Sequence, residues 1–159
     1  RPPVARPIAA RASGGGAGTR ADLKTMEAAG AFGRGVVPAA TAQNPRGVED
    51  SHVLPVESVR AQYRAVVEDF DVAAVKTGML ATEPVVETVA GLLTGYDGPV
   101  VVDPVMIAAS GDRLLTPAAE RAYDDLIAGA TLVTPNADEA AALTDRAVET
   151  PADPDPEAT

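Results

Sequence analysis

Three short apolar segments, each followed by polar or glycine residues and then by a helical pattern, constrain the fold of this chain most. They occupy residues 72–80, 98–103 and 130–136. Short apolar runs between turn signals are typical of strands that are buried on both faces of a parallel sheet. In open α/β sheets, ligands bind just beyond the carboxyl ends of such strands. The repetition therefore predicts a mostly parallel sheet with one binding site along one of its edges.

The polar residues at these strand ends are candidates for that site. Asp103 follows the valines of residues 100–102, and Pro104 then stops the strand because proline cannot donate to the ladder. Lys76 and Asn136 stand at the ends of the other two segments. Taken alone, Asp103 is better explained as the cap of a turn. The recurrence of polar residues after three strands instead favours a shared site, where a carboxylate is suited to a cation or a hydroxyl group.

A glycine-rich segment, Ser-Gly-Gly-Gly-Ala-Gly at residues 13–18, precedes a helical pattern over residues 19–30. Glycine allows the backbone to approach a ligand closely, and a helix N-terminus offers unpaired N–H groups. The segment lacks the lysine and the serine or threonine that follow the last glycine of a phosphate-binding loop. Two interpretations stay open: a cradle for a small polar ligand, and a flexible linker.

Gln43 is a second candidate whose interpretation stays open. A strand is expected over residues 35–41, with a polar loop at residues 45–52, and Gln43 lies where the strand would end. An amide both donates and accepts hydrogen bonds, as the recognition of a heteroaromatic ring edge requires. An amide in a turn explains Gln43 equally well.

The rest of the chain predicts packing elements and a tail. Helical periodicity predicts four further helices, at residues 55–70, 82–93, 116–128 and 136–143. A first short strand is expected at residues 7–10. Glu139 lies in the first turn of the last helix, where an acidic side chain suits the helix dipole. Residues 146–159 are acidic and rich in proline, which predicts a disordered tail after a domain portion at residues 1–145.

Charge and composition exclude several classes of function. The net charge of −10, with only 13 basic residues, disfavours binding to nucleic acids and to anionic membranes. Only two lysines accompany many Ala, Asp and Glu residues, a composition that resembles halophilic adaptation. There is no cysteine and His52 is the single histidine, so thiolate chemistry is excluded and a zinc site is disfavoured. Without a membrane-length apolar run or a signal-like N-terminus, the expected location is cytoplasmic.

Several of these stretches together, in this order, resemble one family. They are Ser-Gly-Gly-Gly-Ala-Gly at 13–18 with Ala-Asp-Leu-Lys-Thr at 21–25, Thr-Ala-Gln-Asn at 41–44, Val-Lys-Thr-Gly-Met-Leu at 75–80, Val-Asp-Pro-Val-Met at 102–106 with Ser-Gly-Asp at 110–112, and Thr-Pro-Asn at 134–136 with Glu139. The ordered set resembles the hydroxymethylpyrimidine/phosphomethylpyrimidine kinases of thiamin biosynthesis, in the ribokinase-like superfamily. The resemblance covers about residues 8–143, and pyridoxal kinases of the same superfamily are the nearest alternative.

The resemblance implies a fold and a reaction. The fold would be α/β and ribokinase-like, a mostly parallel sheet flanked by helices, here incomplete at the C-terminus. A hydroxymethyl oxygen, or a phosphate already on it, would attack the γ-phosphoryl group of ATP. Such a phosphotransferase relies on positioning and on charge neutralisation by Mg²⁺. The family is commonly dimeric, so a homodimer is also implied.

The resemblance also assigns site residues. Asp22 and Gln43 would hydrogen-bond the aminopyrimidine substrate. Met79 and Val105 would line its pocket.

A second set would support the phosphates and Mg²⁺, often through water. It comprises Asp103, Asn136 and Glu139, with Asp103 and Glu139 as the metal-binding carboxylates. Lys76 lies within the motif without an assigned role.

Two departures from the family pattern qualify these expectations. Ala10, Arg11 and Ala12 stand where the family usually has Gly-Ser-Asp, which affects the substrate pocket. The later strands and the glycine-rich loop that carries the base and the anion-hole amides are absent from these 159 residues. No catalytic residue is therefore predicted here, and this chain alone is expected to be inactive. The alternatives are a non-catalytic pyrimidine-binding or regulatory remnant, a pyridoxal kinase-like enzyme, and a structural α/β domain without a ligand.

Overall fold

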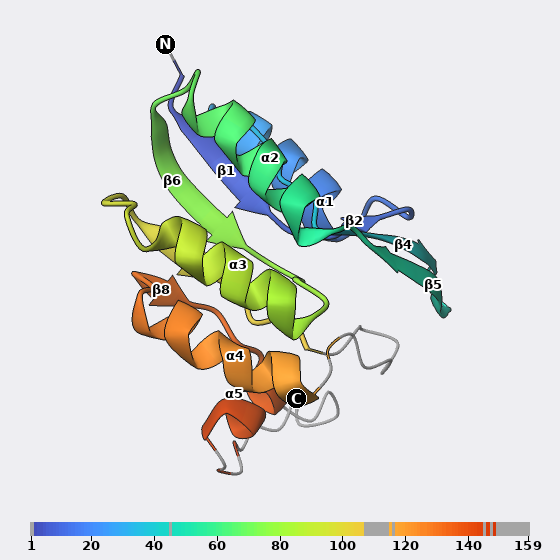
Figure 1. Ribbon diagram of the computed structural model, residues 1–159. Coiled ribbons are helices and arrows are strands. Elements are labelled where there is room, and N and C mark those ends of the chain that lie inside the picture. The colour runs from blue at the N-terminus through green and yellow to red at the C-terminus, as the bar shows by residue number, and fades with distance from the viewer. Residues whose placement is uncertain are drawn as a thin grey trace, which may run out of the picture.

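A parallel five-stranded sheet forms the centre of the molecule. The computed structural model describes residues 2–44, 46–106, 115, 117–144, 146 and 148, without the side chains of residues 117 and 120. The strand order is β3-β1-β6-β7-β8, with all neighbours parallel. The pair β1 and β6 runs side by side in Figure 1. The strands are β1 Val4–Ile8, β3 Phe32–Gly33, β6 Val72–Thr77, β7 Val100–Val102 and β8 Leu132–Val133. The predicted α/β fold with a mostly parallel sheet is confirmed.

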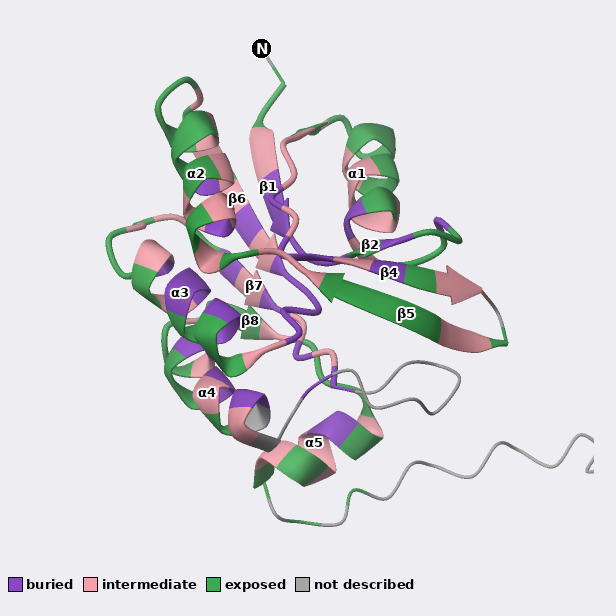
Figure 2. Ribbon diagram, turned by 45° about the vertical axis from the view of Figure 1, so that its right-hand side comes forward, coloured by how far each residue is buried: buried purple, intermediate pink, exposed green. Residues whose placement is uncertain are grey.

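Helices cover both faces of this sheet. The helices are α1 Gly18–Ala28, α2 Val56–Val67, α3 Glu83–Leu93, α4 Pro117–Ala128 and α5 Ala137–Thr144. Helices α2, α3 and α4 lie side by side on one face, and α1 packs on the other, against β1 and β3 (Figure 2). The chain steps from β1 to β3 on one side and later to β6 on the other. The strand order therefore reverses at β1, and a crevice opens at the carboxyl ends of β1 and β6, where open α/β sheets bind ligands.

A small second sheet extends from the main body beside this crevice (Figure 1). Its order is β2-β4-β5, with β2 and β4 parallel and β4 and β5 antiparallel. The strands are β2 Arg11–Ala12, β4 Ala39–Asn44 and β5 Gly47–Val53. This sheet carries Gln43 on β4 toward the pocket described below.

Two expectations for this region were wrong. Residues 35–41 do not form a strand of the main sheet, because Phe32–Gly33 takes that edge and only Val36 adds an isolated bridge to Ile8. Pro38 has no N–H to donate, and the strand begins after it, in the second sheet. The expected polar loop at residues 45–52 is instead mostly β5, which is exposed from Glu49 to His52 and is held by its ladder to β4.

The core lies between the main sheet and helices α2, α3 and α4. It is built from aliphatic side chains, chiefly valine, with two tyrosines: Ile8, Val36, Val59, Tyr63, Val75, Leu80, Val85, Val86, Val89, Leu93, Val100, Val102, Met106, Leu115, Ala119, Tyr123 and Leu126. One charged side chain, Arg6 on β1, is fully buried beside it. In the described part of the chain, no helix is long and apolar enough to cross a membrane.

Two parts of the sequence-based interpretation lie outside the described residues. They are the Ser-Gly-Asp motif at residues 110–112 and nearly all of the tail at residues 146–159. The predicted disorder of the tail stays a prediction.

Candidate active site

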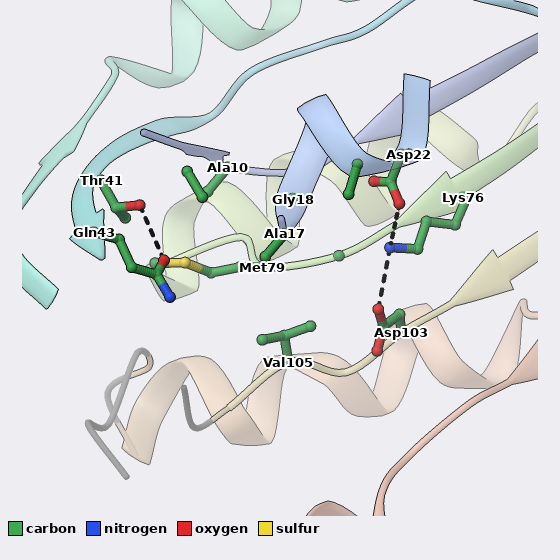
Figure 3. A pocket seen from close by; sticks show the side chains of 13 residues that line it. Ala10, Ala17, Gly18, Asp22, Thr41, Gln43, Lys76, Met79, Asp103 and Val105 are labelled. Carbon is green, nitrogen blue, oxygen red and sulfur yellow. Dashed lines mark hydrogen bonds and ion pairs between the residues drawn. The ribbon is translucent and has the colours of Figure 1, made fainter. Parts of the chain in front are cut away.

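A cavity of about 330 Å³ lies at the carboxyl ends of β1, β6 and β7, below the first turns of α1 (Figure 3). Its lining combines small side chains, two apolar walls, an amide and three charged groups: Ala10, Ala12, Ala17, Gly18, Ala21, Asp22, Thr41, Gln43, Lys76, Gly78, Met79, Asp103 and Val105. Asp22, Gln43, Met79 and Val105, which come from four separate stretches of the sequence, therefore share one cavity, together with Asp103. Their roles in binding stay predictions.

The backbone around Gly18 shapes one wall of this cavity. Gly18 has φ +63°, and an added Cβ would overlap the carbonyl oxygen of Ala10. The Ala10 N–H donates to the carbonyl oxygen of Met79 at 3.0 Å, and the Thr19 N–H donates to the carbonyl of Ala10 at 3.0 Å. The Thr19 hydroxyl also donates to the carbonyl of Ala9. The glycine-rich segment is thus an ordered part of the pocket wall between β1, β6 and α1.

Gln43 is fixed by the same segment. The Ser13 hydroxyl donates to the Gln43 carbonyl at 2.8 Å and accepts from the Gln43 N–H at 2.8 Å. The Thr41 hydroxyl donates to Gln43 Oε1 at 3.4 Å. Since the amide oxygen faces Thr41, the amide Nε2 is left without a partner among the described residues and can donate to a ligand. Gln43 and Thr41 occupy the end of the cavity opposite Asp22 (Figure 3).

Three charged side chains, here called the ionic triad, occupy that other end: Asp22, Lys76 and Asp103. Lys76 Nζ lies 3.1 Å from Asp22 Oδ1 and 3.1 Å from Asp103 Oδ2. Asp22 Oδ2 is buried and has no hydrogen-bond partner among the described residues. A buried acceptor without a partner costs free energy, so this oxygen is suited to accept an N–H group from a ligand in the pocket.

The apolar walls lie between these two polar ends. Met79 is buried and Val105 is half-buried, and both line the cavity. The Asp103 N–H donates to the Thr77 carbonyl at 3.1 Å, and the Val105 N–H donates to the Asp103 carbonyl at 2.9 Å. These bonds hold the turn after β7 against the end of β6. An apolar space with hydrogen-bonding groups at each end suits a small heteroaromatic ring.

The structure does not bring Asn136 and Glu139 into the lining of this cavity. They form a capping box at the start of α5, in which the Asn136 N–H donates to Glu139 Oε2 at 2.9 Å and the Glu139 N–H donates to Asn136 Oδ1 at 2.9 Å. Glu139 is buried, and its Oε1 accepts from the Met106 N–H at 3.3 Å. Both carboxylate oxygens of Glu139 thus already bind backbone N–H groups, and one of them holds the loop that carries Asp103.

Tyr123 on α4 holds the backbone of the pocket wall at Gly78. Its hydroxyl donates to the carbonyl oxygen of Gly78 at 3.1 Å. Burial, with smaller contributions from the charges of Asp103 and Glu139, raises the pKa of Tyr123 above its usual value. The hydroxyl therefore stays protonated and keeps the turn after β6 in place. No group of three or more His, Cys, Asp or Glu side chains arranged to hold a metal ion occurs among the described residues.

Sequence reasoning placed Lys76 among the candidates at the strand ends but gave it no role, and it missed the place of Thr41 in the pocket. The position of Lys76 indicates its place, because a lysine at the end of a buried apolar strand directs its ammonium group toward the carboxyl ends of the strands, where the site lies. Thr41 is buried on a strand whose sheet was not predicted. Nothing in its local sequence indicates that its hydroxyl orients Gln43.

Comparisons with known proteins agree with this arrangement. The family model described as phosphomethylpyrimidine kinase matches residues 12–159. A hydroxymethylpyrimidine/phosphomethylpyrimidine kinase of Streptomyces coelicolor is 56% identical over 144 residues, covering 90% of this chain and 54% of that protein. The chain thus spans about half the length of the curated relatives it matches.

Solved structures give the same result. A phosphomethylpyrimidine kinase from Clostridium difficile superposes with a TM-score of 0.86 at 38% identity, over 94% of this chain and 65% of the other. A Bacillus subtilis pyridoxal kinase, in a structure titled as an ADP complex, superposes with a TM-score of 0.83 at 30% identity, over 94% of this chain and 57% of the other.

Proposed function

Because the chain belongs to the phosphomethylpyrimidine kinase family, we propose that it forms the pyrimidine-binding part of an ATP-dependent kinase. The substrate would be hydroxymethylpyrimidine, its phosphate, or both, and the pathway would be thiamin biosynthesis. The observation that supports this most is the single cavity that collects Asp22, Gln43, Met79 and Val105.

The chemistry of this cavity fits an aminopyrimidine. The ring would lie between Met79 and Val105, where its faces contact apolar atoms. The Gln43 amide would donate to a ring nitrogen, and Asp22 Oδ2 would accept from the amino group. The Gln43 Nε2 and Asp22 Oδ2 atoms, which have no hydrogen-bond partner among the described residues, would thereby each gain one, and specificity for hydrogen-bonding ligands arises in this way.

Mg²⁺ and the phosphates of ATP would be bound on the Asp103 side of the pocket. Mg²⁺ is usually held by one or two carboxylates together with waters and phosphates. Asp103 fits this requirement because only its Oδ2 contacts Lys76. Glu139 fits a supporting role better than direct ligation, since both of its oxygens already accept backbone N–H groups. When bound, the metal ion would neutralise phosphate charge, while Asp103 and Glu139 would keep the loop after β7 in position.

Two expectations from the sequence stay predictions. One is a homodimer. The other is that residues 1–159 alone do not transfer phosphate.

Calorimetric titration of residues 1–159 with hydroxymethylpyrimidine tests the proposal. Asp22→Asn is expected to weaken binding roughly 10- to 100-fold, because a charge-assisted hydrogen bond contributes about 1.5–3 kcal/mol. Asp124→Asn, at an exposed position on α4, is the matched control and should bind normally.

Pyridoxal serves as the comparison ligand for the alternative of a pyridoxal kinase-like enzyme. Weaker binding of pyridoxal than of hydroxymethylpyrimidine is expected. A chain that binds no hydroxymethylpyrimidine at millimolar concentration, or an Asp22→Asn variant that binds it unchanged, would contradict the proposal.

A further inference from the structure

Lys76 is the only cationic side chain in the lining of the described pocket. Lys76 is the next-to-last residue of β6. Its ammonium group lies between the carboxylate of Asp22 on α1 and that of Asp103 in the turn after β7. An ammonium group has three N–H donors. Asp22 Oδ1 accepts one of them, Asp103 Oδ2 forms an ion pair with the ammonium group, and no other partner of this group occurs among the described residues.

The fold leaves space for this ammonium group. A Cβ at Gly78 would lie 3.2 Å from Lys76 Nζ and 3.0 Å from the Cβ of Ala9. Any side chain at position 78 would therefore crowd the ammonium group. The glycine and the two carboxylates together fix Lys76 at the wall of the pocket.

The ionic triad repels the two proposed substrates to different extents, because one is neutral and the other is an anion. Two carboxylates and one ammonium leave one net negative charge beside the pocket. The side chains of Lys76, Asp22 and Asp103 are only 24%, 15% and 30% exposed, so water screens them incompletely. A neutral alcohol meets little repulsion there. A phosphate monoester, with a charge of about −1.5 to −2, meets two carboxylates and needs a cation.

The chemical structure of the substrate places its phosphate near Lys76. Hydroxymethylpyrimidine carries its amino and hydroxymethyl groups on neighbouring carbons of the ring. If Asp22 Oδ2 accepts the amino N–H, the hydroxymethyl oxygen is directed to the same end of the pocket. Lys76 Nζ lies 3.1 Å from the other oxygen of Asp22, so this end is also the location of the ammonium group (Figure 3).

We infer that Lys76 is the specificity-determining residue that lets this pocket accept the phosphate ester as well as the alcohol. The ammonium group donates a further N–H to a phosphate oxygen and keeps its contacts with both carboxylates. The inference rests on the proposed function, since it takes the pyrimidine and its phosphate as the ligands.

The test compares two ligands within each variant. Hydroxymethylpyrimidine and its monophosphate are titrated calorimetrically into residues 1–159, without Mg²⁺ so that no metal bridges the phosphate to a carboxylate. The variants are Lys76→Met, Lys76→Arg and the control Lys24→Met, which removes the other lysine, exposed on α1. The ratio of the two dissociation constants cancels any fraction of unfolded protein.

Lys76→Met is expected to lower the affinity for the monophosphate roughly 10- to 100-fold more than the affinity for the alcohol. Lys76→Arg should restore much of the ratio, and Lys24→Met should leave it unchanged. Equal losses for both ligands, or no loss for either, would overturn the assignment of Lys76 and leave the proposed function standing. Failure of the unsubstituted chain to bind either ligand would overturn both.

Discussion

Replacing Gly18 with alanine is expected to lower the free energy of unfolding by about 3 kcal/mol or more and to weaken pyrimidine binding. Gly18 has φ +63°, and a Cβ there would overlap the carbonyl oxygen of Ala10. Ala10 cannot move away independently, because its N–H donates to the Met79 carbonyl. Relief of the overlap would therefore displace the pocket wall. Urea unfolding followed by circular dichroism measures the change.

The same segment supplies the control for this prediction. A Cβ at Gly16 would meet no described atom within 4 Å, and Gly16 is not among the glycines with positive φ. Gly16→Ala is expected to stay within about 0.5 kcal/mol of the unsubstituted chain. Equal stabilities of the two variants would show that the glycine-rich segment is a flexible linker, which is one of the two interpretations that the sequence left open.

Replacing Arg6 with methionine is expected to raise the free energy of unfolding. Arg6 is fully buried on β1, and none of its guanidinium nitrogens has a hydrogen-bond partner among the described residues. Among the described residues, the ring of Tyr63 offsets part of the cost of burying this charge, with its centroid 4.3 Å from the guanidinium carbon. An uncompensated buried charge costs roughly 3–5 kcal/mol, and the ring contact offsets about 2 kcal/mol. The expected gain is therefore about 1–3 kcal/mol.

Arg34→Met is the matched control. The Arg34 guanidinium carbon also stacks on aromatic rings, 4.4 Å from the centroid of Phe32 and 4.1 Å from that of Phe70, but Arg34 is only half-buried. Water still solvates part of its charge, so methionine there should bring no gain. If Arg6→Met lowers the midpoint of urea unfolding, Arg6 has a stabilising partner, and the inference that its buried charge is largely uncompensated is wrong.

The strands that could be predicted are those with a run of apolar residues in the interior of the main sheet. Residues 72–75 and 100–102 are apolar because β6 and β7 lie inside the sheet with helices packed against them. Asp103 follows from the same pattern, since a carboxylate after such a strand must lie at the sheet edge. The order of these elements along the chain then predicts the parallel sheet.

The strands that could not be predicted depend on tertiary contacts. Arg6 and Pro7 interrupt the apolar pattern of β1, so only its end was expected as a strand, at residues 7–10. β5 is largely exposed and is held by pairing with β4, and its sequence therefore lacks the alternation of a half-buried strand. Prolines and charged residues in such strands are tolerated because the neighbours fix the backbone.

The sequence indicates most of the polar and apolar residues that line the cavity, but it does not indicate their geometry. Asp22, Lys76 and Asp103 come from α1, β6 and the turn after β7, and no local pattern indicates that one ammonium group links the two carboxylates. Asn136 and Glu139 carried a readable signal, because an Asn followed three residues later by Glu resembles a capping box. Their side chains bind each other's backbone N–H groups at the start of α5, and they therefore do not line the cavity.

A crystal structure of residues 1–159 with hydroxymethylpyrimidine tests the central claim most directly. The ring is expected between Met79 and Val105, with its amino group on Asp22 Oδ2 and a ring nitrogen on the Gln43 amide. The hydroxymethyl oxygen should point to Lys76 and Asp103. A ring bound outside this cavity, or bound inside it without contact to either Asp22 or Gln43, would contradict the claim that these residues form the pyrimidine site.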